Sequence, residues 1–185
     1  DFPVYTGRTR PGDVVRFAAV KYTGSWDINP AIQNSVLSSL KDNTNVDVDF
    51  TPHAISLDAK ETGHFPLLFM TGHYDFQFSD AEAAGLARYL NRGGLLVVSS
   101  GAGLKPFDKA FKRELKKVYP NAELIKLPPS HPLFAGGWNS VDRVAFTPPA
   151  LRDNPTLETP EFYGYILDGR LAILYSPYDL MSGVN

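Results

Sequence analysis

Two short apolar runs constrain the fold of this chain more than any other feature. Residues 67–70 are Leu-Leu-Phe-Met, and residues 95–98 are Leu-Leu-Val-Val. Neither run alternates with polar residues, which is typical of a strand covered on both faces, as in a parallel sheet. Each run gives way to small polar residues and glycine. We therefore expect a parallel sheet flanked by helices.

Helical and strand patterns alternate from residue 14 to residue 127. The strongest helix start is Ser79-Asp-Ala-Glu82, which has the form of a capping box. An earlier helix is expected to begin at Pro30, with Asn29 as its cap. A short edge strand is expected over residues 46–51. Near the end, Asp168-Gly169 lies between two apolar stretches and predicts a β-hairpin.

These patterns predict a three-layer α/β sandwich with an antiparallel C-terminal hairpin as an appendage. The 185 residues fit a single domain over residues 1–185. Residues 1–13 are expected to form an extended lead-in, and residues 135–160 an irregular, proline-rich segment.

Charge and composition exclude several classes of function. The net charge of −2 argues against a general nucleic-acid or anionic-membrane binder. No apolar run approaches the roughly 20 residues of a membrane-spanning helix. The chain has no cysteine, which excludes disulfides, thiolate metal sites and a cysteine nucleophile. Because it begins at Asp1 without methionine, we expect an exported or periplasmic protein, with a cytoplasmic location left open.

The candidate catalytic residues are two histidines and two carboxylates. His73 and Asp75 directly follow the first apolar run, and ligands of parallel sheets bind outside the carboxyl ends of the strands. His131, held extended by Pro132, and Asp179 lie on later loops. The four could also form a metal set, but no metal-ligand spacing such as His-Glu-x-x-His is present. We therefore expect neither a metal nor a cofactor.

A second group of residues is expected to bind a ligand. Lys21, Tyr22 and Trp26 follow the first strand and could offer a cation and an aromatic platform to a sugar or a carboxylate. Trp26 could instead plug the end of the core. Ser100 could pair with His131 as a nucleophile, although no Gly-x-Ser-x-Gly elbow is present. The expected ligand-binding residues are Lys21, Tyr22, Trp26, Gly72, Ser100 and Gly101.

Other charged and titratable residues are interpreted as surface features. Six basic residues between positions 105 and 117 predict a solvated outer helix face rather than a nucleic-acid site. His53 and His64 lie in polar, loop-like surroundings and are interpreted as ordinary surface residues.

The order of several motifs resembles a bacterial family of unknown function within the class I glutamine amidotransferase-like superfamily, near the trehalose-utilisation-protein-like branch. These motifs are Lys21-Tyr22, Trp26, Asn29-Pro30, Thr71-Gly72-His73, Asp80-Ala-Glu82, Gly93-Gly94, Phe107-Asp108, His131-Pro-Leu-Phe134, Asp168-Gly-Arg170 and Tyr175-Ser-Pro-Tyr-Asp179. The resemblance implies a flavodoxin-like sheet but no assigned activity. Active members carry a cysteine in the turn after a central strand, and the corresponding turn here, residues 99–103, has none. Glutamine hydrolysis by thiolate attack is therefore excluded.

Three functional hypotheses follow. The first is a cysteine-less domain that binds a small polar ligand, such as a carbohydrate, at the strand ends. The second is a hydrolase that uses His73 or His131 as a general base, with Asp75 or Asp179 assisting. The third is a protein-interaction or self-association domain, with residues 148–160 and Phe162-Tyr163 as its contact surface.

Overall fold

The computed structural model describes residues 14–135, Leu151 and residues 161–180. The predicted lead-in and nearly all of the proline-rich segment lie outside these residues. In chain order, the elements are β1 (Phe17–Val20), α1 (Ile32–Asn43), β2 (Ala54–Ile55), the 3-10 helix η1 (Lys60–His64), β3 (Leu67–Gly72), α2 (Asp80–Asn91), β4 (Leu95–Ser100), the 3-10 turn η2 (Gly101–Gly103), α3 (Lys105–Val118), β5 (Ile125–Lys126), α4 (Pro132–Ala135), β6 (Tyr163–Leu167) and β7 (Arg170–Ser176).

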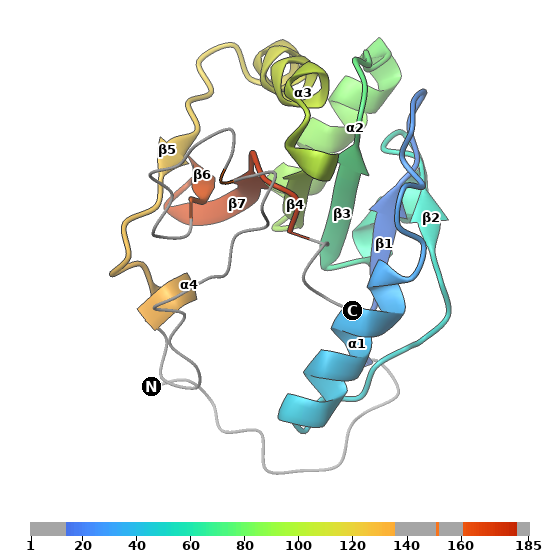
Figure 1. Cartoon of the computed structure of the whole chain (residues 1–185). Helices are drawn as coiled ribbons and strands as arrows, with labels where there is room; N and C mark the ends of the chain where they lie inside the picture. The colour runs from blue at the N-terminus through green and yellow to red at the C-terminus, as the bar shows by residue number, and fades with distance from the viewer. Residues whose placement is uncertain (1–13, 136–150, 152–160, 181–185) are drawn as a thin grey trace.

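The strands form one seven-stranded sheet in the order β2-β1-β3-β4-β7-β6-β5 (Figure 1). The first five strands in this order pair in parallel, whereas β6 and β5 are antiparallel additions at one side. The expected α/β sandwich with a mostly parallel sheet is therefore confirmed.

The C-terminal hairpin is confirmed, but it is not an appendage. Its second strand, β7, pairs in parallel with β4 over the register Leu96↔Ile173 to Ser99↔Ser176. Residues 172–176 of β7 are all buried. Such a strand buries apolar side chains on both faces of the sheet. It is therefore more stable inside the sheet than at its rim.

Helices cover both faces of the sheet (Figure 1). On one face, Ile32 and Leu37 of α1 pack against Phe17 and Phe69. On the other face, α2 and α3 bury the larger core against the alternate residues of the strands. That core includes Leu68, Met70, Leu86, Leu90, Phe107 and Phe111. In the described part of the chain, no helix is long and apolar enough to cross a membrane.

The two predicted helix starts have different outcomes. At α2 the capping box is confirmed, since Ser79 Oγ accepts the Glu82 N–H at 3.2 Å and Glu82 Oε2 accepts the Ser79 N–H at 2.8 Å. The predicted cap of α1 is wrong. That helix begins at Ile32 without a side-chain cap, and Asn29 only supplies its backbone carbonyl to the Ile32 N–H. The Asn29 amide is thus left for another role.

The predicted edge strand over residues 46–51 is also wrong. Within it, Val48 forms a single isolated bridge with Val15, and the edge strand is instead β2. The Asp49 carboxylate accepts the backbone N–H of Thr51 at 2.9 Å and pairs with Arg16 at 2.9 Å. A side chain that bonds its own backbone in this way turns the chain and competes with a strand ladder.

Candidate functional site

The strand order places a crevice between β1 and β3. The chain leaves β1 towards α1 on one face of the sheet and leaves β3 towards α2 on the other face. The two connecting loops therefore diverge at this point. In doubly wound sheets, ligands bind at such a switch point, outside the carboxyl ends of the strands.

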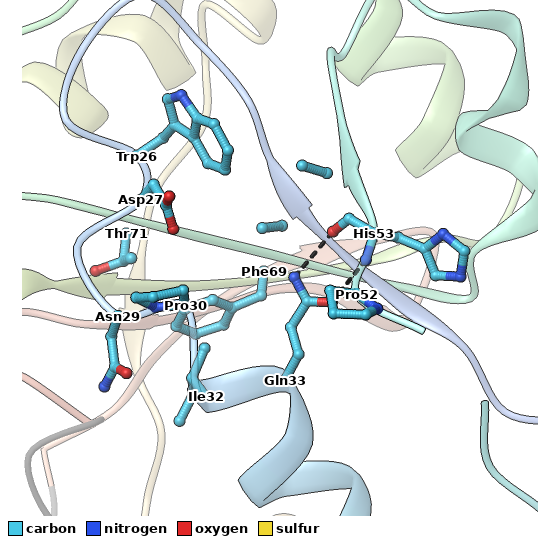
Figure 2. Close-up of a pocket in the computed structure, with 12 residues that line it drawn as sticks. Trp26, Asp27, Asn29, Pro30, Ile32, Gln33, Pro52, His53, Phe69 and Thr71 are labelled. Atoms are coloured by element: carbon cyan, nitrogen blue, oxygen red, sulfur yellow. Dashed lines mark hydrogen bonds between the residues drawn. The ribbon is translucent and has the colours of Figure 1, made fainter. Parts of the chain in front are cut away.

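A pocket of about 200 Å³ lies at this position, on the α1 side of the sheet (Figure 2). The loop from β1 to α1 contributes Trp26, Asp27 and Asn29, and β3 contributes Thr71. Of these four residues, the sequence predicted only Trp26 as a ligand contact. Asn29 was assigned to a helix cap, and a single threonine or aspartate near a strand end carries no recognisable motif.

Thr71 is the most informative residue of the pocket. It is only 5% exposed, and its Oγ1 has no hydrogen-bond partner among the described residues. It alternates with Met70 and Gly72, so it faces the same side of the sheet as Phe69, towards α1. Buried hydroxyls are nearly always hydrogen-bonded, and an unpaired one costs about 1–3 kcal/mol. A polar ligand in the pocket would supply the missing partner.

Thr71 is one of three buried hydroxyls that lie side by side at the ends of adjacent strands. Its register partner is Ser99 on β4, whose own register partner is Ser176 on β7. Ser99 Oγ accepts the Leu180 N–H at 3.0 Å, and Ser176 Oγ donates to the Tyr178 carbonyl at 2.9 Å. Tyr178 and Leu180 thus bond two hydroxyls of the row, whereas the third, on Thr71, has no partner among the described residues.

One wall of the pocket is held by a reciprocal pair of hydrogen bonds (Figure 2). The buried Gln33 amide donates to the His53 carbonyl at 2.9 Å and accepts the His53 N–H at 3.0 Å. His53 was predicted to be a surface residue, but it is half-buried, and its ring packs against Phe65. In Figure 2 the His53 imidazole points away from Trp26 and Asp27, so His53 lines the pocket through its backbone.

His73 follows β3 and lies beside the carboxyl end of the neighbouring strand, β4. Its backbone N–H donates to Ser25 Oγ at 3.3 Å, and its half-buried imidazole packs on the α-carbon of Gly101. A Cβ at Gly101 would collide with this ring and with Ile28. No hydrogen bond to the imidazole is found within the described residues. The structure thus brings together His73 and Gly101, two of the residues predicted from the sequence.

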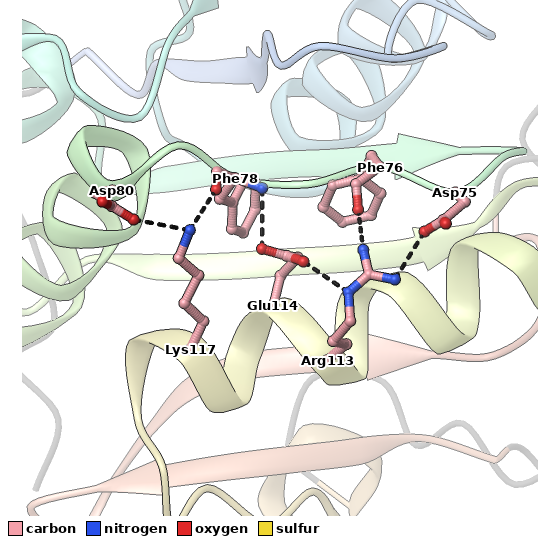
Figure 3. Close-up of polar contacts among 7 residues, drawn as sticks. All are labelled: Asp75, Phe76, Phe78, Asp80, Arg113, Glu114 and Lys117. Atoms are coloured by element: carbon pink, nitrogen blue, oxygen red, sulfur yellow. Dashed lines mark hydrogen bonds and ion pairs between the residues drawn. The ribbon is translucent and has the colours of Figure 1, made fainter.

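Asp75 points towards Arg113 of α3 (Figure 3). Its carboxylate accepts from Arg113 Nη1 at 3.0 Å, and both side chains are largely exposed. The same guanidinium donates to the Phe76 carbonyl and to Glu114. Asp75 is thus bound to α3 and does not orient the His73 ring in this structure.

Two basic residues of α3 hold the loop that leads from β3 to α2 (Figure 3). Besides Arg113, Lys117 Nζ donates to the Phe78 carbonyl at 2.7 Å and pairs with Asp80 at 3.0 Å. The buried Glu114 between them accepts the Phe78 N–H at 3.0 Å. The helix face predicted to be merely solvated therefore has a structural role at these positions, because its cations bind loop carbonyls.

Three of the predicted ligand-binding residues are buried in the core. Tyr22 is 6% exposed and donates its hydroxyl to the Thr71 carbonyl at 2.9 Å, and burial raises the pKa of the phenol. A Cβ at Gly72 would collide with that hydroxyl and with Phe107. The Ser100 hydroxyl donates to the Leu104 carbonyl at 2.9 Å and has no exposed surface. None of the three side-chain positions opens to the crevice, whereas Lys21 is exposed.

Asp179 holds the turn after β4. Its Oδ2 accepts the Ala102 N–H at 3.0 Å. Ala102 lies between Gly101 and Gly103 with φ +51°, in the left-handed region that is uncommon for residues with a side chain. The carboxylate thus supports an unusual backbone conformation directly beside His73 and Gly101.

His131 lies apart from these residues. It follows β5, and its Nδ1 accepts the Leu133 N–H at 3.2 Å. In the sheet, β5 is the fourth strand from β3, a lateral distance of about 19 Å at roughly 4.8 Å per strand. Among the described residues, no hydrogen bond or ring contact links His131 to His73 or Ser100, and the segment that follows His131 packs through Phe134 on Leu127 and Leu174. Among the described residues, no group of three or more histidines and carboxylates could hold a metal ion.

Comparison with known proteins assigns a family to the chain. Residues 16–185 match the model of a family described as a domain of unknown function, DUF4159. Because the match covers most of the chain, the protein belongs to this family. No curated protein matches the sequence.

Proposed function

We propose that this protein is an amidotransferase-like domain without the nucleophilic cysteine, and that it binds a small polar ligand of the carbohydrate class between β1 and β3. The observation that carries the proposal is the buried Thr71, which lines the pocket and whose hydroxyl has no partner among the described residues. A sugar hydroxyl both donates and accepts hydrogen bonds, so it can satisfy Thr71 in either direction.

The other groups around the pocket suit the same ligand class. Trp26 offers an aromatic surface, Asp27 a carboxylate acceptor and Asn29 an amide that both donates and accepts. A few polar groups beside an aromatic wall are typical of small-molecule sites. The volume of about 200 Å³ is below the roughly 300–1,000 Å³ of drug-sized sites, which favours a single sugar ring over a longer chain.

The turn after β4 supports the amidotransferase-like part of the proposal. β4, η2 and α3 form a strand-turn-helix unit with the left-handed Ala102 at its apex. A nucleophile elbow has the same strand-turn-helix arrangement, with the reactive side chain on a strained residue. Here that position carries a methyl group, and the whole chain contains no cysteine. These residues are compatible with binding without glutaminase chemistry.

The proposal is tested by calorimetric titration of the chain with a panel of monosaccharides, sugar acids and polyols. Two variants remove pocket groups, Asn29→Ala and Thr71→Val. Asn34→Ala is the matched control, because Asn34 is exposed on α1 and does not line the pocket. We expect at least one sugar to bind, and each pocket variant to weaken binding by about tenfold, as the loss of one hydrogen bond of about 1.4 kcal/mol would.

The control variant should bind the sugar within about twofold of the original chain. The proposal is wrong if no member of the panel binds, or if both pocket variants bind as tightly as the control. A purely structural role for the pocket residues would leave binding absent in every variant.

A further inference from the structure

We propose a second binding site on this domain, for a small anion with two or more phosphate-like groups, in a groove at the amino-terminal rim of the sheet. The groove has a volume of about 720 Å³ and is lined by η1 and by the end of α2. Pro66 and Gly94, which directly precede β3 and β4, also line it. It therefore lies at the opposite ends of these strands from the sugar pocket, and the proposal does not depend on that pocket.

Four basic side chains line this groove. They are Lys60 and His64 from η1, and Arg88 and Arg92 from the end of α2. No acidic side chain lines the groove. Within the described residues, none of the four forms an ion pair or a side-chain hydrogen bond. Since the chain as a whole carries a net charge of −2, this cluster is not a by-product of a basic protein.

The end of a helix could by itself account for basic residues there, because its free carbonyls attract cations. In this protein another residue meets that need. Arg170 of β7 donates to the carbonyls of Leu90 and Gly94, at 2.5 and 2.9 Å. The Leu90 carbonyl at the end of α2, and the Gly94 carbonyl just after it, therefore already have a guanidinium partner. Arg88 and Arg92 remain available to a ligand from solution.

The chemistry of the groove defines the ligand class. A guanidinium group can bind two oxygens of one phosphate or carboxylate at once, and a lysine adds a point charge. A groove lined by cations also raises the local concentration of anions. The volume lies within the roughly 300–1,000 Å³ of small-molecule sites, so it admits more than one charged group. The space at Gly63 is also open, since a Cβ there would meet nothing within 4 Å.

The test is calorimetric titration of inorganic pyrophosphate into the chain at low ionic strength, with three variants. Arg88→Gln with Arg92→Gln removes two cations, and Gly63→Glu adds a carboxylate in open space. Lys105→Gln with Lys116→Gln is the matched control, because it removes two exposed cations of α3 that do not line the groove.

We expect pyrophosphate to bind, with affinity lowered about tenfold or more in both groove variants and changed less than about twofold in the control. Thermal unfolding should confirm that all three variants remain folded, since every changed residue is exposed. The proposal is overturned if pyrophosphate gives no binding heat, or if the control loses as much affinity as the groove variants. It is also overturned if orthophosphate binds as tightly as pyrophosphate.

Discussion

At the scale of single residues, Thr71 and Ser99 make a natural comparison. They are register partners on neighbouring strands, and both hydroxyls are buried. Ser99 accepts the Leu180 N–H, whereas Thr71 Oγ1 has no partner among the described residues. The same chemical group therefore stabilises the fold at one position and opposes it at the next.

We expect Thr71→Val to raise the free energy of unfolding by about 1 kcal/mol, because valine has the same shape and removes an unpaired buried hydroxyl. Ser99→Ala should lower it by about 1–3 kcal/mol, because it leaves backbone groups of the segment after β7 without their partner. Urea denaturation of both variants measures the difference. Equal destabilisation by the two substitutions would show that Thr71 is satisfied within the protein.

The sequence could not identify Thr71 as a site residue. Its position at a strand end was visible, but the lack of a partner for its hydroxyl depends on the packing around it in three dimensions. His73 and Gly101 were predicted because each lies at the end of a recognisable apolar strand, and the structure places them in contact. Tyr22 and Gly72 were predicted to bind a ligand because they also lie at strand ends. Only their packing, with Tyr22 and Phe107 against Gly72, shows that they belong to the core and not to the crevice.

At the scale of elements, α2 packs very closely on the chain that precedes it. A Cβ at Gly85 would collide with the backbone carbonyl of Leu57. Glycine inside a helix normally costs about 1 kcal/mol relative to alanine. Here it allows the helix and the segment before η1 to touch, and η1 and the end of α2 together line the basic groove.

Gly85→Ala should therefore destabilise the protein by about 1–3 kcal/mol, despite the better helix propensity of alanine, because backbone atoms cannot move aside cheaply. Gly63→Ala is the control, since its Cβ would lie in open space and should change stability by less than about 0.5 kcal/mol. Chemical denaturation checks both values. A stabilised Gly85→Ala variant would mean that α2 can shift away from Leu57.

Elements with strong local signals were predictable from the sequence. The capping box of α2 and the Asp168-Gly169 turn depend on neighbouring residues alone, and both are confirmed. The cap of α1 and the strand over residues 46–51 were wrong, because an Asn-Pro pair and a few alternating residues are compatible with several local structures. The contacts of Arg113, Glu114 and Lys117 with the loop between β3 and α2 were not predicted, since that loop is distant from them in the sequence.

At the scale of the whole molecule, β7 joins the two parts of the sheet. It pairs with β4 on one side and with β6 on the other, so within the described part of the sheet β6 and β5 connect to the parallel strands only through it. The sequence predicted the hairpin but not its position, because the order of strands in a sheet depends on long-range pairing.

A chain that ends at residue 160 should therefore have no cooperative thermal transition and should bind a hydrophobic dye, since it leaves the edge of β4 and its core exposed. Removal of residues 1–13 is the control, because the family match begins at residue 16, and that chain should keep its transition. Calorimetry with dye fluorescence distinguishes the cases. Cooperative unfolding of the shortened chain would show that β1 to β4 form an independent unit.

The central place of β7 has a consequence for biosynthesis. On the ribosome, β4 emerges long before β7, the strand that will pair with its edge. While translation continues, the nascent chain therefore exposes an unpaired strand edge with apolar side chains. Protection by a chaperone during that interval, or rapid elongation through the intervening codons, would then determine how much of the newly made polypeptide escapes aggregation.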